Sequence, residues 1–273
     1  MPNRRAFLAI ALFGLLALSL GVARSESARL YLSYWRPVAA LGFESGDLSG
    51  WQLFRLSSPD AARVVSAPTR TGAYAAAITL HPEGRYGDAF KSELSDAFHA
   101  PFGKEVWYRL SHYLAPEFSL PKGNYCVLAQ WHSVSPSDAG LGAKPPLALR
   151  YANGRAKVTI SFSRERFRDP KQVTTMSLYE TEFANGRWHD FVYRVVFAGD
   201  DSGRVDVWHD GKHVARYAGP VGYPGDPMGP YFKTGMYCLR DPAKPLTAYV
   251  DEYRRGRRAS DVLLPGETLE DAP

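Results

Sequence analysis

The sequence has few cysteines, only a mild net charge and no long amphipathic helix. Only two cysteines occur among 273 residues, and neither a C-x-x-C motif nor a Cys/His cluster for zinc or redox chemistry is present. The formal net charge of +5 is too mild for a nucleic-acid partner, and the basic run at 254–258 is interpreted as a solvated terminal charge run, with an anion-facing surface as the alternative. No segment sustains the 3.6-residue period of a useful helix. These shortages exclude zinc-finger, redox-motif, helical and nucleic-acid-binding classes.

The N-terminus is typical of an export signal. Arg4 and Arg5 precede an uncharged run at 6–22, which is followed by small and polar residues. The arginine pair also resembles a twin-arginine signal. An uncleaved anchor is the alternative, because the run lies at the short end of the roughly 17–25 residues that span a bilayer. We expect residues 1–25 to be a signal peptide of a periplasmic or secreted protein.

The remaining chain is expected to form one all-β domain. Residues 26–41 are interpreted as a connector, 42–258 as the domain and 259–273 as a loose polar tail. Asn153-Gly154 and Asp210-Gly211 are typical turns of tight hairpins. Many short strands at regular spacing predict a sandwich or barrel. The strand candidates are 62–66, 73–80, 90–98, 105–114, 124–133, 146–151, 156–163, 188–197, 203–209, 212–217, 231–238 and 246–254.

Two of these candidates carry polar side chains with useful chemistry. The two-residue period of a strand places Tyr231, Lys233 and Tyr237 on one face, and Gln130 and His132 likewise share a face. A long amide in an otherwise apolar strand fits a groove better than a core, because a buried amide needs hydrogen-bond partners. Each residue also has a structural interpretation, since tyrosine is a common strand residue and most histidines are not catalytic. The opposite face, toward the core, holds Phe232, Thr234 and Met236.

The same period argues against a disulfide between the two cysteines. Cys126 has the parity of Gln130, whereas Cys238 has the parity opposite to Lys233 and Tyr237. In regular strands of one sheet the two thiols would therefore point to opposite faces. A β-bulge would reset the parity, and export would permit the bridge. The favoured interpretation is a free thiol at Cys238 on the core side.

An ordered set of motifs resembles the heparin lyase I-like polysaccharide lyases. This superfamily of concanavalin-like jelly rolls also includes glucuronan lyases and, more remotely, alginate lyases. The resemblance covers about residues 42–256. It implies a β-sandwich of two antiparallel sheets whose concave face binds substrate, and cleavage of a uronic-acid polysaccharide by β-elimination. The motifs are FESGDLSGW from Phe43, KSEL from Lys91, QWH from Gln130, GRWHDF from Gly186, VDVWHDG from Val205, YFKTGMY from Tyr231 and VDE from Val250.

The resemblance also implies roles for individual residues. Gln130 and Lys91 would bind or neutralise the substrate carboxylate, where negative charge builds as the C5 proton leaves. His132 would act as base or assist neutralisation, and Tyr237 would act as acid and also as a candidate base. Lys233, on the face of Tyr237, would favour the tyrosinate. No cofactor is needed for this chemistry, and the substrate-binding residues would include Lys233, Tyr231, Glu93 and Arg150.

The sequence departs from the alginate lyases at two positions. Lys91 precedes Glu93 where those enzymes have Arg two residues before Glu, so carboxylate recognition would differ or involve Arg85 or Arg150. Cys238 stands where they usually have Asn. This second departure weakens alginate specifically as the substrate.

Three acidic residues near the ends of the domain are candidates for a structural calcium ion. Glu44, Asp47 and Asp251 would supply oxygens that join the terminal strands. Acidic turn chemistry is the alternative.

Two rival functions remain at this stage. A non-catalytic carbohydrate-binding jelly roll has no need for a phenol, an amine and an imidazole together. A jelly-roll glycoside hydrolase needs two carboxylates about the scissile bond, and the E-x-D-x-x-E pattern is missing from the sequence. We expect a monomeric enzyme that binds an acidic polysaccharide, with no stable protein partner and no nucleic acid.

Overall fold

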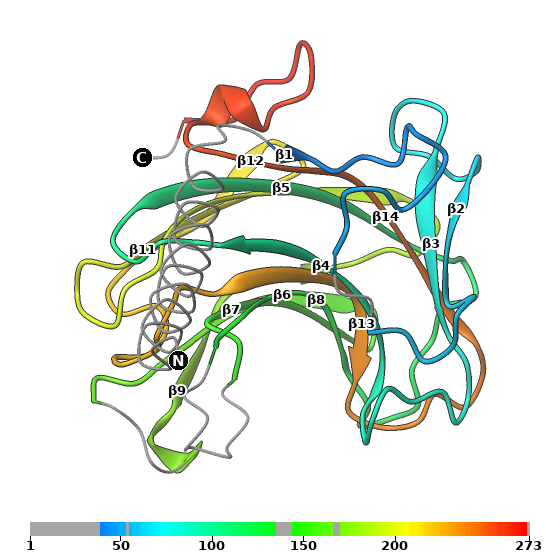
Figure 1. Cartoon of the computed structure of the whole chain (residues 1–273), viewed down its shortest axis with the longest axis horizontal. Coiled ribbons are helices and arrows are strands. Elements are labelled where there is room, and N and C mark those ends of the chain that lie inside the picture. The colour runs from blue at the N-terminus through cyan, green and yellow to red at the C-terminus, as the bar shows by residue number, and fades with distance from the viewer. Residues whose placement is uncertain (1–38, 53–54, 135–143, 166–169, 272–273) are drawn as a thin grey trace, which may run out of the picture. The chain divides into compact units, whose positions relative to one another are not determined.

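The computed structural model describes residues 39–52, 55–134, 144–165 and 170–271 (Figure 1). The predicted signal peptide lies outside these residues. Within them, no helix is long and apolar enough to cross a membrane. The strands are β1 (Ala39–Ala40), β2 (Ala62–Val65), β3 (Ala75–Leu80), β4 (Phe90–His99), β5 (Glu105–Leu114), β6 (Cys126–His132), β7 (Leu147–Ala152), β8 (Arg155–Phe162), β9 (Thr174–Glu182), β10 (Trp188–Val196), β11 (Arg204–His209), β12 (Lys212–Ala218), β13 (Tyr231–Cys238) and β14 (Leu246–Gly256), with short 3-10 helices at Pro170–Gln172 and Ala259–Asp261.

The strands form two antiparallel sheets, which confirms the predicted all-β jelly-roll sandwich. Sheet A has the order β12-β11-β10-β5-β14-β3-β2, with β1 also paired to β14, and sheet B has the order β4-β13-β6-β7-β8-β9. Figure 1 shows sheet B arching beneath sheet A, with its concave side turned away from sheet A. The motif strands β4, β13 and β6 are therefore neighbours within the curved sheet.

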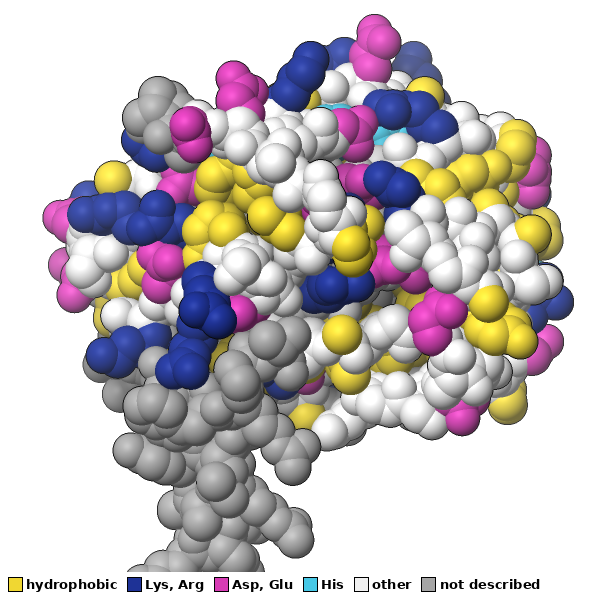
Figure 2. All heavy atoms as spheres, turned by 90° about the horizontal axis from the view of Figure 1, so that it is seen from above, with side chains coloured by type: hydrophobic (Ala, Val, Ile, Leu, Met, Phe, Trp, Pro, Cys, Tyr) yellow, Lys and Arg dark blue, Asp and Glu magenta, His cyan; other side chains and the backbone are white. Residues whose placement is uncertain are grey.

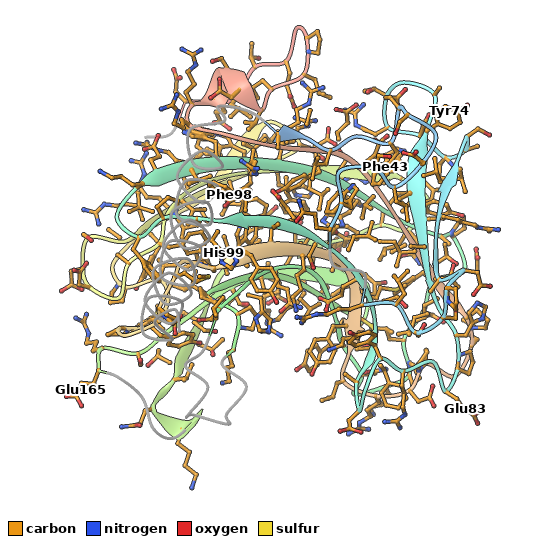
Figure 3. The ribbon with its side chains drawn as sticks, in the orientation of Figure 1. Phe43, Tyr74, Glu83, Phe98, His99 and Glu165 are labelled. Carbon is orange, nitrogen blue, oxygen red and sulfur yellow. A yellow bond between two sulfur atoms is a disulfide. The ribbon has the colours of Figure 1, made fainter. Side chains whose placement is uncertain are left out.

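Aromatic side chains fill the space between the sheets. Trp131 of β6 is fully buried and packs its ring edge-on against Tyr193 of β10 at 4.8 Å, and Phe232 of β13 stacks on Tyr253 of β14 at 4.6 Å. Phe43, at the start of the domain, is also buried and stacks on Trp51 (Figure 3). Large aromatic rings bury much apolar surface each, so they hold the sheets together.

The outer face of sheet A carries charges of both signs. Seen from above, basic and acidic side chains are interspersed with hydrophobic ones (Figure 2). Ion pairs join neighbouring strands there, as between Arg194 and Glu105 at 2.7 Å and between Arg216 and Asp206 at 2.8 Å. Interspersed charges leave this face without a dominant charge of one sign.

The C-terminal segment is packed, so the prediction of a loose tail from residue 259 is wrong for residues 259–271. Val262 is fully buried against Trp107 and Trp208, and Leu269 packs against the same cluster. Glu267 forms an ion pair with Arg109, a fully buried cation of β5. The segment thus covers part of sheet A. The predicted connector also reaches the sheet, because β1 at its end pairs with β14.

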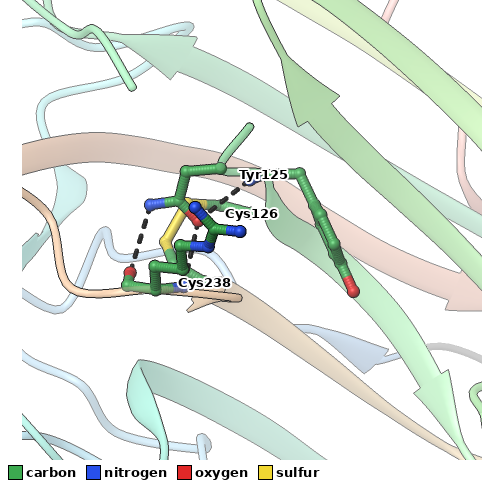
Figure 4. The surroundings of a disulfide bond; sticks show 5 residues. Tyr125, Cys126 and Cys238 are labelled. Carbon is green, nitrogen blue, oxygen red and sulfur yellow. Dashed lines mark hydrogen bonds between the residues drawn. A yellow bond between two sulfur atoms is a disulfide. The ribbon is translucent and has the colours of Figure 1, made fainter. Parts of the chain in front are cut away.

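The structure corrects the expectation that the cysteines are free. Cys126 of β6 and Cys238 of β13 are register partners, both buried, and form a disulfide (Figure 4). The β6–β7 register shifts between Val127 and Ala129. This bulge resets the parity, so Val127 shares the face of Gln130 and Cys126 turns to the core side.

Candidate active site

Strands β4, β13 and β6 bring most of the predicted site residues together on the concave face. In β13, Lys233 lies opposite Gln130 of β6 and Tyr237 lies opposite Lys91 of β4. Glu93 lies two residues beyond Lys91 on the same face of β4, and His132 occupies the corresponding position beyond Gln130 in β6.

Gln130, Glu93 and Lys233 form a buried polar cluster within this face. None of the three residues is more than 2% exposed. Gln130 donates a hydrogen bond from Nε2 to Oε1 of Glu93, and Lys233 Nζ lies 3.7 Å from Glu93 Oε2. Burial lowers the pKa of Lys233 to about 8, although the negative charge of Glu93 opposes this shift. Glu93 and Lys233 were predicted to bind substrate, and in this structure both are buried and pair with each other.

His132 has the geometry of a neutral proton acceptor. Its Nδ1 lies 2.7 Å from the carbonyl oxygen of Ser133 and therefore carries the proton that it donates there. The lone pair is then on Nε2. Burial, with a smaller contribution from the positive charge of Lys233, lowers the pKa of His132 to about 4. The imidazole is therefore uncharged at neutral pH, which favours the role of base over that of a cationic neutraliser.

Tyr237 is the open member of the set, with 41% of its surface exposed. The ammonium of Lys91 lies 5.4 Å from the centre of its ring. Burial lowers the pKa of Lys91, against the pull of Glu93. The predicted partner, Lys233, lies instead near the ring of Tyr231, at 5.4 Å from its centre. The cation beside the Tyr237 phenol is therefore Lys91, not Lys233.

Tyr231 lies at the inner end of the site. Its ring is 8% exposed and lies 5.3 Å from the ring of His99 and 5.5 Å from that of His132. Burial raises the pKa of Tyr231. Its contacts make it a support for the His132 ring more than an open substrate contact.

A groove of about 350 Å³ crosses this part of sheet B. Gln130, His132 and Tyr237 line it together with Arg150 and Lys144. A second hollow of about 560 Å³ shares Tyr125, Lys144 and Arg150 with the first and continues over β7 and β8, so the two form one path along sheet B. Volumes of this size suit a sugar ring in each part.

Arg150 is the cation of this path that the sequence singled out. Its Nε donates to Oγ1 of Thr159 at 3.1 Å, and its guanidinium lies 5.7 Å from the centre of the Tyr125 ring. Burial lowers its pKa from the usual arginine value. Arg150 is therefore fixed in place at the junction of the two hollows, a position suited to an anionic substrate.

Sequence reasoning missed Arg55. Its backbone pairs with Glu93 through hydrogen bonds of 2.9 and 3.0 Å, which extends the concave face beyond β4. Its positive charge contributes to the lowered pKa values of Lys233 and His132. No sequence signal marks it, because it belongs to no strand and no motif.

The three acidic residues predicted to bind calcium do not come together as ligands in the described part of the chain. Glu44 accepts hydrogen bonds from the backbone N–H groups of Ala73 and Tyr74. Asp251 Oδ2 accepts one from the backbone of Arg70 at 2.8 Å. Asp47 Oδ1 instead accepts bonds from Ser45 and Ser49 within its own turn. Loop and turn hydrogen bonds thus use all three carboxylates.

The two-sheet sandwich of this chain is also the fold of three solved structures of polysaccharide lyases. An endo-β-1,4-glucuronan lyase from the fungus Trichoderma reesei has a TM-score of 0.68 and 21% identity, over 80% of this chain and 95% of that one. The family 7 alginate lyase A1-II′ has a TM-score of 0.56 and 15% identity, over 81% and 100%. The alginate lyase PA1167 from Pseudomonas aeruginosa has a TM-score of 0.51 and 18% identity, over 78% and 100%.

Residues 43–254 match the family model described as polysaccharide lyase. The chain therefore belongs to the polysaccharide lyase family. No curated protein sequence matches it significantly.

Proposed function

We propose that this polysaccharide lyase cleaves a uronic-acid polysaccharide by β-elimination in the groove of sheet B. One observation supports this above others. A neutral imidazole with a free Nε2, a solvent-open phenol and an oriented amide line one groove that also holds cations. A binding module requires no such set, and the similar structures are lyases of glucuronan and alginate by their names.

In the proposed reaction His132 Nε2 removes the C5 proton of the uronate. The electron pair from the C5–H bond forms the C4–C5 double bond as the bond from C4 to the glycosidic oxygen breaks. Tyr237 donates its phenolic proton to the departing oxygen, and proton exchange with water restores both groups. The negative charge that gathers on the carboxylate is stabilised by the Gln130 amide and by Lys91, each such donor contributing about 3 kcal/mol in comparable sites.

A glucuronic acid polymer is the first substrate to test. Of the three structures compared above, the glucuronan lyase has the highest TM-score to this chain. The sequence departures at Lys91 and Cys238 point the same way, because both distinguish the chain from alginate lyases. This finer placement, within the heparin lyase I-like group on its glucuronan side, is part of the proposal.

Export is also proposed. The basic start and apolar run of residues 1–22 support it, and so does the Cys126–Cys238 disulfide, because such bonds persist in oxidising compartments.

The deciding experiment offers purified protein glucuronan, alginate, heparin and neutral glucan while the ultraviolet absorbance of the unsaturated uronate is followed. We expect absorbance to rise with glucuronan and not with neutral glucan. Reducing ends that appear without absorbance would show hydrolysis and overturn the proposal. Binding without any cleavage of the uronate polymers would favour a carbohydrate-binding module.

A further inference from the structure

A cluster of metal-ligand side chains lies away from the groove, on sheet A. His189 of β10 and His209 of β11 place Nδ1 and Nε2 at 3.1 Å from each other, and Asp210 Oδ2 lies 3.6 Å from His209 Nε2. One ligand atom from each residue lies within 4.8 Å of the other two. Within the described residues this is the only group of three or more such side chains. The paired strands and the tight turn that begins at Asp210, with φ of 50°, fix the arrangement.

The far atom of each ligand is held by a second partner. His189 Nε2 lies 3.0 Å from the carbonyl oxygen of Ala184 and so carries the proton, which leaves the lone pair on Nδ1. Asp210 Oδ1 accepts the backbone N–H of Asp190 at 2.9 Å, so that Oδ2 is the oxygen that faces the two histidines. His209 Nδ1 lies 3.2 Å from the hydroxyl of Tyr179 on β9. Metal-binding histidines and carboxylates are typically oriented by outer partners of this kind.

A guanidinium occupies the place where the lone pairs converge. Arg187 places one NH2 group 3.2 Å from His189 Nδ1 and 3.0 Å from Asp210 Oδ2. Its side chain is 52% exposed, so it can turn into solvent without disturbing the core. The cluster therefore already holds a positive charge at the point that a metal ion would take.

We propose that His189, His209 and Asp210 form a binding site for a divalent transition ion of the Zn²⁺ type, which takes the place of the Arg187 guanidinium. Two imidazole nitrogens and one carboxylate oxygen suit Zn²⁺, and also Cu²⁺ or Ni²⁺, whereas Ca²⁺ and Mg²⁺ select oxygen ligands. His209 can offer the lone pair on Nε2 when its Nδ1–H donates to the Tyr179 hydroxyl, so no net proton is lost from the ring. Water completes the coordination on the exposed side of Asp210.

The bound ion would join three strands from two sheets. His189 and His209 belong to neighbouring strands of sheet A, and Tyr179 connects the site to β9 at the edge of sheet B. An ion that binds the folded state and not the unfolded chain raises the unfolding temperature. The site is therefore expected to be structural and independent of lyase activity, since the proposed catalytic residues lie on β4, β6 and β13 of sheet B.

The test uses full-length mature protein without a histidine tag, stripped with a chelator and titrated with Zn²⁺ by calorimetry. We expect one ion per chain and a higher unfolding temperature with Zn²⁺. Asp210→Asn should weaken binding by about tenfold or more while keeping the turn, because Asn also adopts positive φ. Tyr179→Phe should weaken it by about tenfold through the outer hydrogen bond. Arg187→Ala should tighten it, because the competing cation is gone.

The matched control is His81→Gln, since His81 is exposed and lies outside the cluster. This variant should bind Zn²⁺ as the wild type does. Wild-type protein that binds no Zn²⁺ overturns the proposal, whatever Arg187→Ala does. Binding that is unchanged in Asp210→Asn, or that is lost in His81→Gln, overturns it as well.

Discussion

Replacing Tyr237 by phenylalanine tests the proposed acid most directly, because it removes one oxygen from an open position. The ring is 41% exposed, so its packing contributes little, and surface changes of this kind usually alter stability by less than about 0.5 kcal/mol. Loss of a positioned proton donor typically lowers the rate by about 10²–10⁴-fold, equivalent to about 3–5 kcal/mol of activation free energy. We expect kcat to fall by this factor with the unfolding temperature unchanged.

The assay follows unsaturated uronate by absorbance, and urea unfolding of the same samples reports stability. Tyr125→Phe is the matched control, because Tyr125 is another exposed phenol of the same groove. It should keep activity within a few fold of the wild type. If Tyr237→Phe retains full activity, or if both variants lose it equally, the phenol of Tyr237 is not the acid.

Three further predictions concern the base, the disulfide and the central strand. Burial lowers the pKa of His132 to about 4, and only the neutral ring can accept a proton. We therefore expect kcat/KM on the acid side to fall only as the pH drops through about 4. A fall centred near pH 6.5 would contradict the assignment of His132 as base. The Cys126–Cys238 bond closes a loop with a sequence separation of 112 residues, so the double variant Cys126→Ser/Cys238→Ser should lose about 2–5 kcal/mol of unfolding free energy, measured with urea. Dithiothreitol should cause the same loss in the wild type and no loss in the double variant. Gly235→Ala should lower the free energy of unfolding by at least about 1 kcal/mol, because the φ of Gly235 is 131° and an added Cβ would lie 2.2 Å from the carbonyl oxygen of Ser92 in β4. The control Gly42→Ala should leave it unchanged, because no atom lies within 4 Å of an added Cβ there.

Most strands could be predicted because alternation and turn chemistry agree along them. The Asn153-Gly154 and Asp210-Gly211 hairpins are present, and the predicted 105–114 and 231–238 are β5 and β13. Strand β9 was missed because it is largely exposed and so lacks apolar alternation. The packing of Val262 was missed because a single buried side chain after a short 3-10 helix leaves no periodic pattern.

The candidate site shows which part of the geometry a two-residue period can provide. The two-residue period correctly placed Gln130 and Lys233 on the concave face of sheet B, but it does not predict how deeply a side chain on that face is buried. The surroundings of Lys233 include the carboxylate of Glu93 from the neighbouring strand β4 and the positive charge of Arg55 from a segment beyond that strand. The disulfide depends on a bulge in β6, and the position of a bulge follows from the packing of three strands together.

The buried cluster beneath the groove also explains why an enzyme for an anionic polymer keeps a carboxylate so close to its substrate. The carboxylate of Glu93 accepts hydrogen bonds, so the amide of Gln130 turns its NH2 group toward it. This contact fixes the orientation of the Gln130 amide. One N–H then remains for the substrate carboxylate. Lys233 lies 3.7 Å from Glu93 and balances its charge, because an unpaired buried carboxylate would be costly and would repel a uronate. Under the proposed function, Glu93 and Lys233 would act together as positioning residues, and we expect the less buried Lys91 and Arg150 to be the cations that meet the polymer.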